Sequence, residues 1–204
     1  GCDGSWHLTG GCSVRVGWLS DIHLNFLSDS AAGEFVAGLS SVGAKAWVLG
    51  GDIGQADSVS RYLRLFDDLA PGTTYFTLGN HDFFGGSLAG VRDAVLQLVS
   101  DARHLVWLTE AAPQFVDDGV AIVGDDSWGD GRFGDPLGTP VELSDFYMIR
   151  ELTGLTRPAL VAVLNRLGDE AAGRLAPKLE EAAGSCHSVV VVTHVPPFRE
   201  AAWY

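Results

Sequence analysis

Apolar and polar positions follow two recurring patterns along the chain. Short, mostly apolar runs that are typical of strands occupy residues 14–20, 46–49, 73–78 and 188–193. Longer stretches with apolar residues three or four positions apart, as on one face of a helix, occupy residues 30–42, 58–69 and 87–102. The run SVVVVT at 188–193 has no alternation, which favours a strand buried on both faces. Strands that alternate with helices predict a largely parallel sheet flanked by helices.

The second half of the chain is less regular. Short strands are expected at 105–108, 114–116 and 120–123, with a hairpin signal between the last two. Residues 124–143, rich in Gly and Asp, are expected to form a long loop. A helix is expected over residues 156–183, which the glycines at 168–173 or Pro177 could interrupt.

Polar residues that can bind a metal follow four of these strands. Asp21 and His23 follow the first, Asp52 the second, and His194 the last. The strand at 73–78 is followed by the stretch Gly79-Asn80-His81-Asp82. Ligands collect beyond the carboxyl ends of parallel strands, so these side chains are expected to meet there.

The donor types indicate which cations would fit. Each of these polar residues, taken singly, is common in turns, but their recurrence at four strand ends favours a shared metal site. Asp21 and His23 are two residues apart and would point the same way from extended backbone. Asp52 follows two glycines, so its carboxylate could reach between two ions. Nitrogen and oxygen ligands without sulfur suit two divalent ions of Mn, Fe, Zn or Ni.

The ordered series D-x-H, G-D, G-N-H-D and a late strand ending in His resembles the calcineurin-like metallophosphoesterase superfamily, from Asp21 to His194. The resemblance implies an α/β fold of four layers, an α/β/β/α sandwich. It also implies that Asp21 and His23 hold one metal, that Asp52 bridges both, and that Asn80 and His194 hold the second.

The same resemblance implies the chemistry, which is hydrolysis of a phosphomonoester or phosphodiester by a hydroxide that bridges two ions, with Mn expected to serve in vitro. His81 would contact the phosphate or protonate the leaving group, and Asp82 would orient its ring. The family usually ends with a G-H-x-H motif, and nothing after His194 matches it. We expect residues 1–13 to be an extension and 14–204 to be a domain that is incomplete at its C-terminus; a naturally incomplete site is the alternative.

Charge and cysteine content limit the partners. There are 26 acidic and 13 basic residues, a formal charge of −13, which argues against nucleic acid as a partner. This charge would also repel the small phosphorylated substrate that we expect, unless bound divalent metals invert the local charge. No apolar run reaches the roughly 18 residues of a membrane helix. Three cysteines form no disulfide framework, which indicates the cytoplasm. A zinc site from Cys2, His7 and Cys12 would have a non-standard spacing.

The loop at 125–136 leaves two interpretations open. Counted from Asp126, it lacks the oxygen ligands that a calcium loop needs at its third and twelfth positions, which are Trp128 and Leu137. It could be a solvated loop, or a rim over the metals in which Trp128 and Arg132 touch the substrate. The alternative function is a phosphoesterase-like scaffold that binds partners without catalysis. A nuclease is a third reading, which the acidic balance disfavours.

Overall fold

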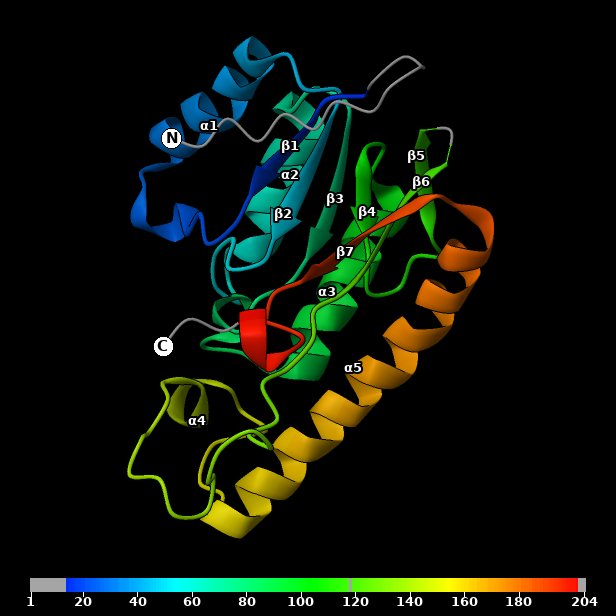
Figure 1. Ribbon diagram of the computed structural model, residues 1–204. Helices are drawn as coiled ribbons and strands as arrows, with labels where there is room; N and C mark the ends of the chain where they lie inside the picture. Colours follow the sequence, from blue (N-terminus) through cyan, green and yellow to red (C-terminus); the bar gives the residue numbers. More distant parts are fainter. Residues whose placement is uncertain (1–13, 118, 202–204) are drawn as a thin grey trace.

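The computed structural model describes residues 14–117 and 119–201, which form two sheets (Figure 1). The first sheet is parallel, in the order β1 (Val16–Leu19), β2 (Ala46–Gly50), β3 (Thr73–Thr77) and β4 (Leu105–Trp107). In the second, β6 (Val120–Asp125) pairs antiparallel with β5 (Gln114–Asp117) and parallel with β7 (Ser188–Thr193).

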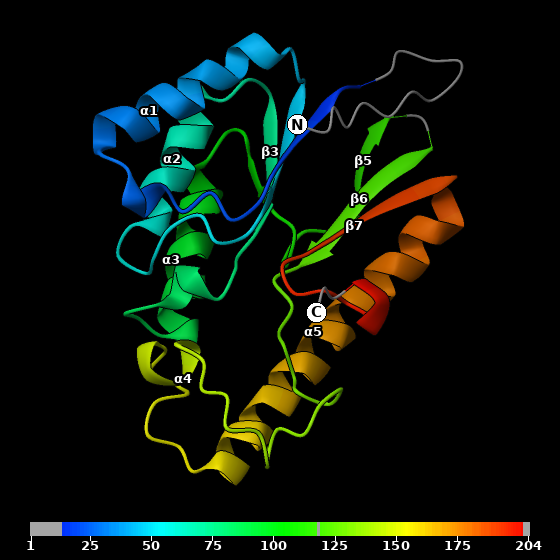
Figure 2. The same cartoon turned by 60° about the vertical axis from the view of Figure 1, so that its left-hand side comes forward.

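Helices cover the two outer faces of this pair of sheets. The first sheet is covered by α1 (Asp29–Gly38), α2 (Val59–Leu69) and α3 (Leu88–Asp101), and the second by α5 (Arg157–Ser185), as Figures 1 and 2 show. Shorter elements are η1 (Leu24–Phe26), η2 (Leu39–Val42), η3 (His81–Phe83), α4 (Asp145–Met148) and η4 (Arg199–Ala201). The expected α/β/β/α sandwich is therefore confirmed.

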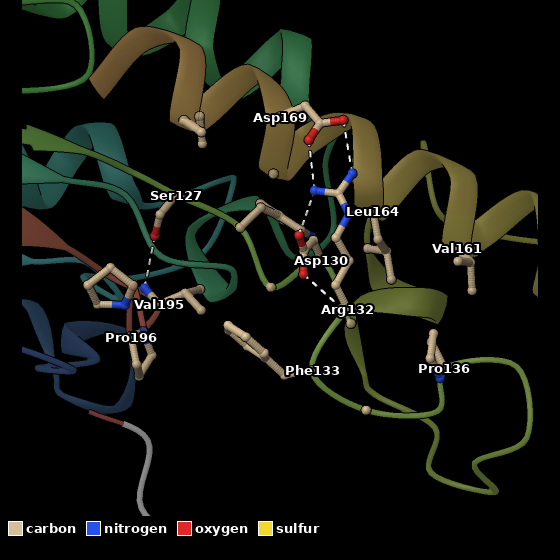
Figure 3. A pocket seen from close by; sticks show the side chains of 18 of the residues that line it. Ser127, Asp130, Arg132, Phe133, Pro136, Val161, Leu164, Asp169, Val195 and Pro196 are labelled. Atoms are coloured by element: carbon tan, nitrogen blue, oxygen red, sulfur yellow. Dashed lines mark hydrogen bonds and ion pairs between the residues drawn. The ribbon is translucent and has the colours of Figure 1, made fainter. Parts of the chain in front are cut away.

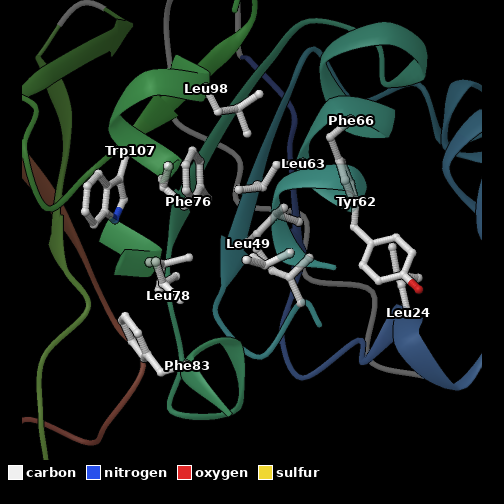
Figure 4. Close-up of a cluster of buried hydrophobic side chains, with 14 of the residues drawn as sticks. Leu24, Leu49, Tyr62, Leu63, Phe66, Phe76, Leu78, Phe83, Leu98 and Trp107 are labelled. Carbon is white, nitrogen blue, oxygen red and sulfur yellow. The ribbon is translucent and has the colours of Figure 1, made fainter. Parts of the chain in front are cut away.

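Alternation along the strands explains why the sheets are sandwiched. On β2, Trp47 and Leu49 belong to the core beneath α1–α3, whereas Ala46 and Val48 belong to the core between the sheets. The first of these cores is the larger and includes Tyr62, Phe66 and Phe76 (Figure 4). A smaller cluster forms where Ala121 and Val123 of β6 meet α5 at Ala182.

Two local predictions are wrong. Helix α5 is not interrupted at 168–173 or at Pro177, because Leu175, Leu179 and Ala182 on both sides of the proline pack against the second sheet. The strand β7 is not buried on both faces. Only its Val192 is buried, because β7 pairs with β6 alone in the described chain and is the outer strand of its sheet.

Among the described residues, no helix has the length and apolar character needed to span a membrane.

Candidate metal centre

The segments after β1, β2, β3 and β7 bring their polar side chains together, with the carboxylate of Asp52 in the middle. Its Oδ2 atom lies 3.7 Å from His23 Nε2 and 3.9 Å from His81 Nε2. Its Oδ1 atom lies 3.4 Å from His194 Nε2. Asp52 itself is only 4% exposed. Three imidazole rings from three separate segments therefore surround one buried carboxylate.

The potential ligands form two groups that share Asp52. One consists of His23, Asp52 and His81, and the other of Asp21, Asp52 and His194; within each group the ligand atoms lie within 4.8 Å of one another. Two groups with a common carboxylate fit a pair of divalent cations. The grouping differs from the pairing of Asp21 with His23 that the resemblance implies.

The backbone explains this difference. Asp21 and His23 were expected on extended backbone, but both are left-handed, with φ angles of 53° and 41°. Their backbone N–H groups donate to the carbonyls of Gly51 and Asp52, so the segment follows the turn after β2. Asp52 is left-handed as well, with φ of 54°. Strained residues of this kind concentrate at functional sites, where the surrounding structure holds them.

Two glycines allow the strand ends to approach this closely. A Cβ atom on Gly79 would lie 2.1 Å from Asp52 Oδ1 and 2.7 Å from His194 Cε1. A Cβ atom on Gly51, whose φ is 91°, would lie 2.6 Å from the backbone nitrogen of Gly79. A larger residue at either position would separate Asp52 from His194.

The hydrogen bonds of His194 leave one nitrogen facing oxygen atoms. Its Nδ1 lies 2.8 Å from the carbonyl of Gly50, an acceptor, so Nδ1 carries a proton. Its Nε2 lies 3.1 Å from Asn80 Oδ1. The amide of Asn80 is held in that orientation because its Nδ2 donates to Asp145 Oδ1 at 2.8 Å. Lone pairs of His194, Asn80 and Asp52 thus converge, an arrangement that a cation or a proton between them would stabilise.

His81 lies at the open side of the cluster. Its backbone N–H donates to Asp52 Oδ1 at 3.0 Å. Its ring stacks on Phe84, with 4.2 Å between ring centroids, and meets the ring of His23 edge-on at 4.8 Å. The side chain is 38% exposed, so it can reach a substrate as well as a cation beside Asp52.

Asp82 is buried, and its carboxylate binds the backbone of two loops. It accepts hydrogen bonds from the N–H groups of Ile53, Gly54 and Gly79, at 2.9, 2.7 and 2.8 Å. Burial raises its pKa to about 7, although the bonds from Gly54 and Gly79 lower it. These bonds connect the loop that carries Asp52 to the loop that carries Asn80, and the His81 ring is not among the partners found in the described chain.

The two expected substrate contacts lie in different places. Trp128 borders a cavity of about 250 Å³ that also contains Asn80 and His194, and its ring packs on Phe83. Arg132 is not brought to this cluster. Its guanidinium binds Asp130 at 2.8 Å and Asp169 at 2.7 Å, in the adjoining groove (Figure 3).

Sequence reasoning missed two residues at the site. Asp145 orients the Asn80 amide, and the buried Asp126 accepts a bond from the backbone N–H of Leu78. Asp126 follows an apolar strand, the same signal that identified Asp52, whereas no signal identified Asp145. Cys2, His7 and Cys12, whose spacing does not match a standard zinc site, lie outside the described residues.

Comparison with known proteins adds a family and a fold. The family model described as calcineurin-like phosphoesterase matches residues 14–204. No curated protein matches the sequence significantly. The phosphopantetheinyl hydrolase PptH from Mycobacterium tuberculosis has a similar structure, with a TM-score of 0.67 and 17% identity over 94% of this chain and 71% of its own. The protein TT1561 of Thermus thermophilus has a TM-score of 0.57 and 15% identity over 92% of this chain and 71% of its own.

Proposed function

Because the chain belongs to the calcineurin-like phosphoesterase family, we propose that it hydrolyses small phosphate esters with two divalent cations held around Asp52. The observation that carries this proposal is the convergence of acceptor atoms from His194, Asn80 and Asp52, with His23 on the other side of the carboxylate. Family membership supports a hydrolase, and the two ligand groups support a dinuclear centre.

In this proposal each residue has one role. Asp52 would be shared by both cations, with His23 on one side of its carboxylate and Asn80 and His194 on the other. Asp21 would complete the side of His194, with which the structure groups it, rather than that of His23 as the resemblance implies. When bound, the cations would activate a water molecule and neutralise charge on the phosphoryl oxygens. Mn is our first choice in vitro, with Fe, Zn and Ni as alternatives for this donor set.

His81 and Asp82 act differently from the ligands. We assign His81 to the phosphoryl group or the leaving oxygen, to which its exposed ring could donate a proton. Asp82 positions the loops after β2 and β3 through its three backbone bonds. Trp128 would border the bound ester, because it lines the cavity next to Asn80.

The substrate class follows from charge and from the fold relatives. A formal charge of −13 disfavours nucleic acid, and the structural relative from Mycobacterium tuberculosis is a phosphopantetheinyl hydrolase. The first feature disfavours a large polyanion, and the second supports a small phosphorylated molecule as substrate.

The test is hydrolysis of p-nitrophenyl phosphate and of its bis ester by the full-length protein with added Mn²⁺, together with metal analysis. We expect two metal ions per chain and measurable turnover of at least one ester. Asp52→Asn should lower metal content and reduce turnover by more than about 100-fold, since even residues that only support metal ligands are worth about 10–100-fold. Asp57→Asn, at an exposed acid in the same loop, is the matched control. A fully metal-loaded protein without turnover would instead indicate a binding scaffold.

A further inference from the structure

A long groove adjoins the proposed metal centre. It has a volume of about 860 Å³ and lies between the 127–143 loop, helix α5 and residues 193–197 (Figure 3). The smaller cavity that contains Asn80 and His194 lies next to it, because the two share lining residues, among them Trp128, Phe146, Leu164 and Val195. A molecule bound by its phosphate at Asn80 would therefore have the groove immediately beside it.

The lining of the groove is mainly apolar. Helix α5 contributes aliphatic side chains on both sides of Gly168 and Asp169, from Leu160 to Leu164 and from Ala171 to Leu179. Leu160 and Leu179 are 19 positions apart, or about 28 Å of helix at 1.5 Å per residue. Across from it stand Phe133, which is 71% exposed, and Val195 (Figure 3). An exposed aromatic ring beside an apolar helix face is suited to bury a long apolar chain.

The cationic groups in the groove are already neutralised. Arg132 and Arg157 are the two cationic side chains among its described lining residues. Arg132 is paired with Asp130 and Asp169, and Arg157 with Glu142 at 2.5 Å. The described lining therefore offers no free cation to a second phosphate or a carboxylate, and its acid Asp135 would repel one. An uncharged chain is the ligand that this lining favours.

We propose that the groove binds the uncharged, largely apolar chain of an extended phosphate ester whose phosphate lies at the metal centre. This inference rests on the proposed function and narrows its substrate class. Long-chain monoesters should be better substrates than short ones, and polyanionic esters such as nucleotides should gain nothing from the groove.

The test compares ethyl, n-hexyl and n-decyl phosphate, below their micelle concentrations, with phosphate release by the full-length Mn²⁺-loaded protein as the readout. Each methylene that enters the groove should raise kcat/KM about fourfold, until the chain fills the site. From ethyl to decyl phosphate we expect kcat/KM to rise by at least about 100-fold, which this increment gives even when only four of the added methylenes are buried. Equal kcat/KM for the three esters would overturn the inference, while their hydrolysis would leave the proposed function intact.

A variant in the groove separates chain binding from chemistry. Ala172 is exposed on α5 and lines the groove, so A172E places a charge there without filling the core. It should lower the ratio of kcat/KM for decyl over ethyl phosphate by at least about tenfold, because a buried unpaired charge is unfavourable. A183E, on the same helix but outside the groove, is the matched control and should leave the ratio unchanged.

A binding measurement keeps the inference testable even if no ester is hydrolysed. n-Decylphosphonate should bind the wild type and the A183E protein more tightly than ethylphosphonate, and A172E should remove that preference, as measured by calorimetry. No preference in the wild type would overturn the inference. Sedimentation of the same proteins tests whether a second copy of the chain occupies the groove instead. A dimer that A172E dissociates would show that another copy of the chain covers the groove, and would overturn it too.

Discussion

The carboxylate of Asp126 accepts a hydrogen bond of 2.7 Å from the backbone N–H of Leu78, the residue that precedes Gly79 and Asn80. The same oxygen accepts bonds from the Trp107 indole at 2.9 Å and the Thr109 hydroxyl at 2.7 Å. Asp126 follows β6 of the second sheet, and Leu78 follows β3 of the first. A buried carboxylate therefore connects the two sheets directly behind the proposed metal ligand Asn80.

This buried acid predicts a pH dependence of stability. Burial raises the pKa of Asp126 above its ordinary 3.8, although the bonds from Leu78, Trp107 and Thr109 and the charge of Arg92 lower it. The folded state thus favours the protonated acid, and the stability that Asp126 contributes is greatest below pH 3.8 and declines as the pH rises through the folded pKa. Asp126→Asn cannot titrate, so the free energy of unfolding of wild type minus variant should fall as the pH rises.

Urea denaturation of both proteins from about pH 4 to about pH 8, with a chelator present, measures that difference. A constant offset between the unfolding free energies of the two proteins reflects altered hydrogen bonds. It does not affect how their difference changes with pH. A difference that stays the same across this range, or grows, would contradict the prediction.

The proposed role of His81 makes a second prediction. His81→Ala should leave the metal content unchanged and lower kcat by about 10²–10⁴-fold, the usual contribution of a general acid. His104→Ala, at an exposed histidine outside the site, serves as the control. Metal analysis and steady-state kinetics on one ester are the measurements. Loss of metal in the His81 variant would instead assign His81 as a ligand, a role that its grouping with His23 and Asp52 permits.

Patterning along the chain predicts most of the fold because short apolar runs and helical repeats reflect local contact with the core. The apolar residues Tyr62, Leu63 and Phe66 share a helix face and are buried as expected. The continuity of α5 could not be predicted, because Pro177 signals a break and only packing of its neighbours against the second sheet overrides that signal.

The candidate site also combines residues that local pattern predicts with residues whose placement depends on the folded chain. Asp52, Asn80 and His194 could be found because each closely follows an apolar strand, and strand ends converge in this fold. The left-handed backbone of Asp21 and His23 could not, since it depends on hydrogen bonds to the turn after β2. Asp145 lies 65 residues from Asn80 in a segment without periodicity, so the path of the intervening chain determines their contact.

Asp145 leads to a prediction about metal affinity. Asp145→Ala removes the acceptor for Asn80 Nδ2, so the amide is free to turn its oxygen away from His194. Affinity for Mn²⁺ should fall about 10–100-fold, as for other residues that orient metal ligands. Asp145→Asn keeps an acceptor oxygen and should restore most of the affinity. Calorimetric titration with Mn²⁺ measures both, and equal weakening in the two variants would mean that the charge, rather than the orientation, matters.

The ion pair between Arg174 and Asp125 leads to a prediction about stability. The Asp125 side chain is fully buried, and Arg174 binds it through two nitrogens, at 2.7 and 3.0 Å. Arg174→Ala removes the cation that binds that carboxylate directly and leaves Lys178, which interacts with it only through its charge. Because the arginine is 29% exposed and water can partly replace it, we expect a loss near the lower end of the range for broken buried pairs, about 3 kcal/mol.

The matched control lies on the same helix. Arg166 is 3.7 Å from Glu170, and both side chains are largely exposed, so Arg166→Ala should change stability by less than about 0.5 kcal/mol. Urea denaturation of the two variants and the wild type measures both losses under one condition. Similar losses would mean that water solvates Asp125 once the guanidinium is gone, and that burial of this carboxylate does not make the pair important. A large loss for Arg174→Ala alone would show that α5 is held to β6 by this charge as well as by its apolar face.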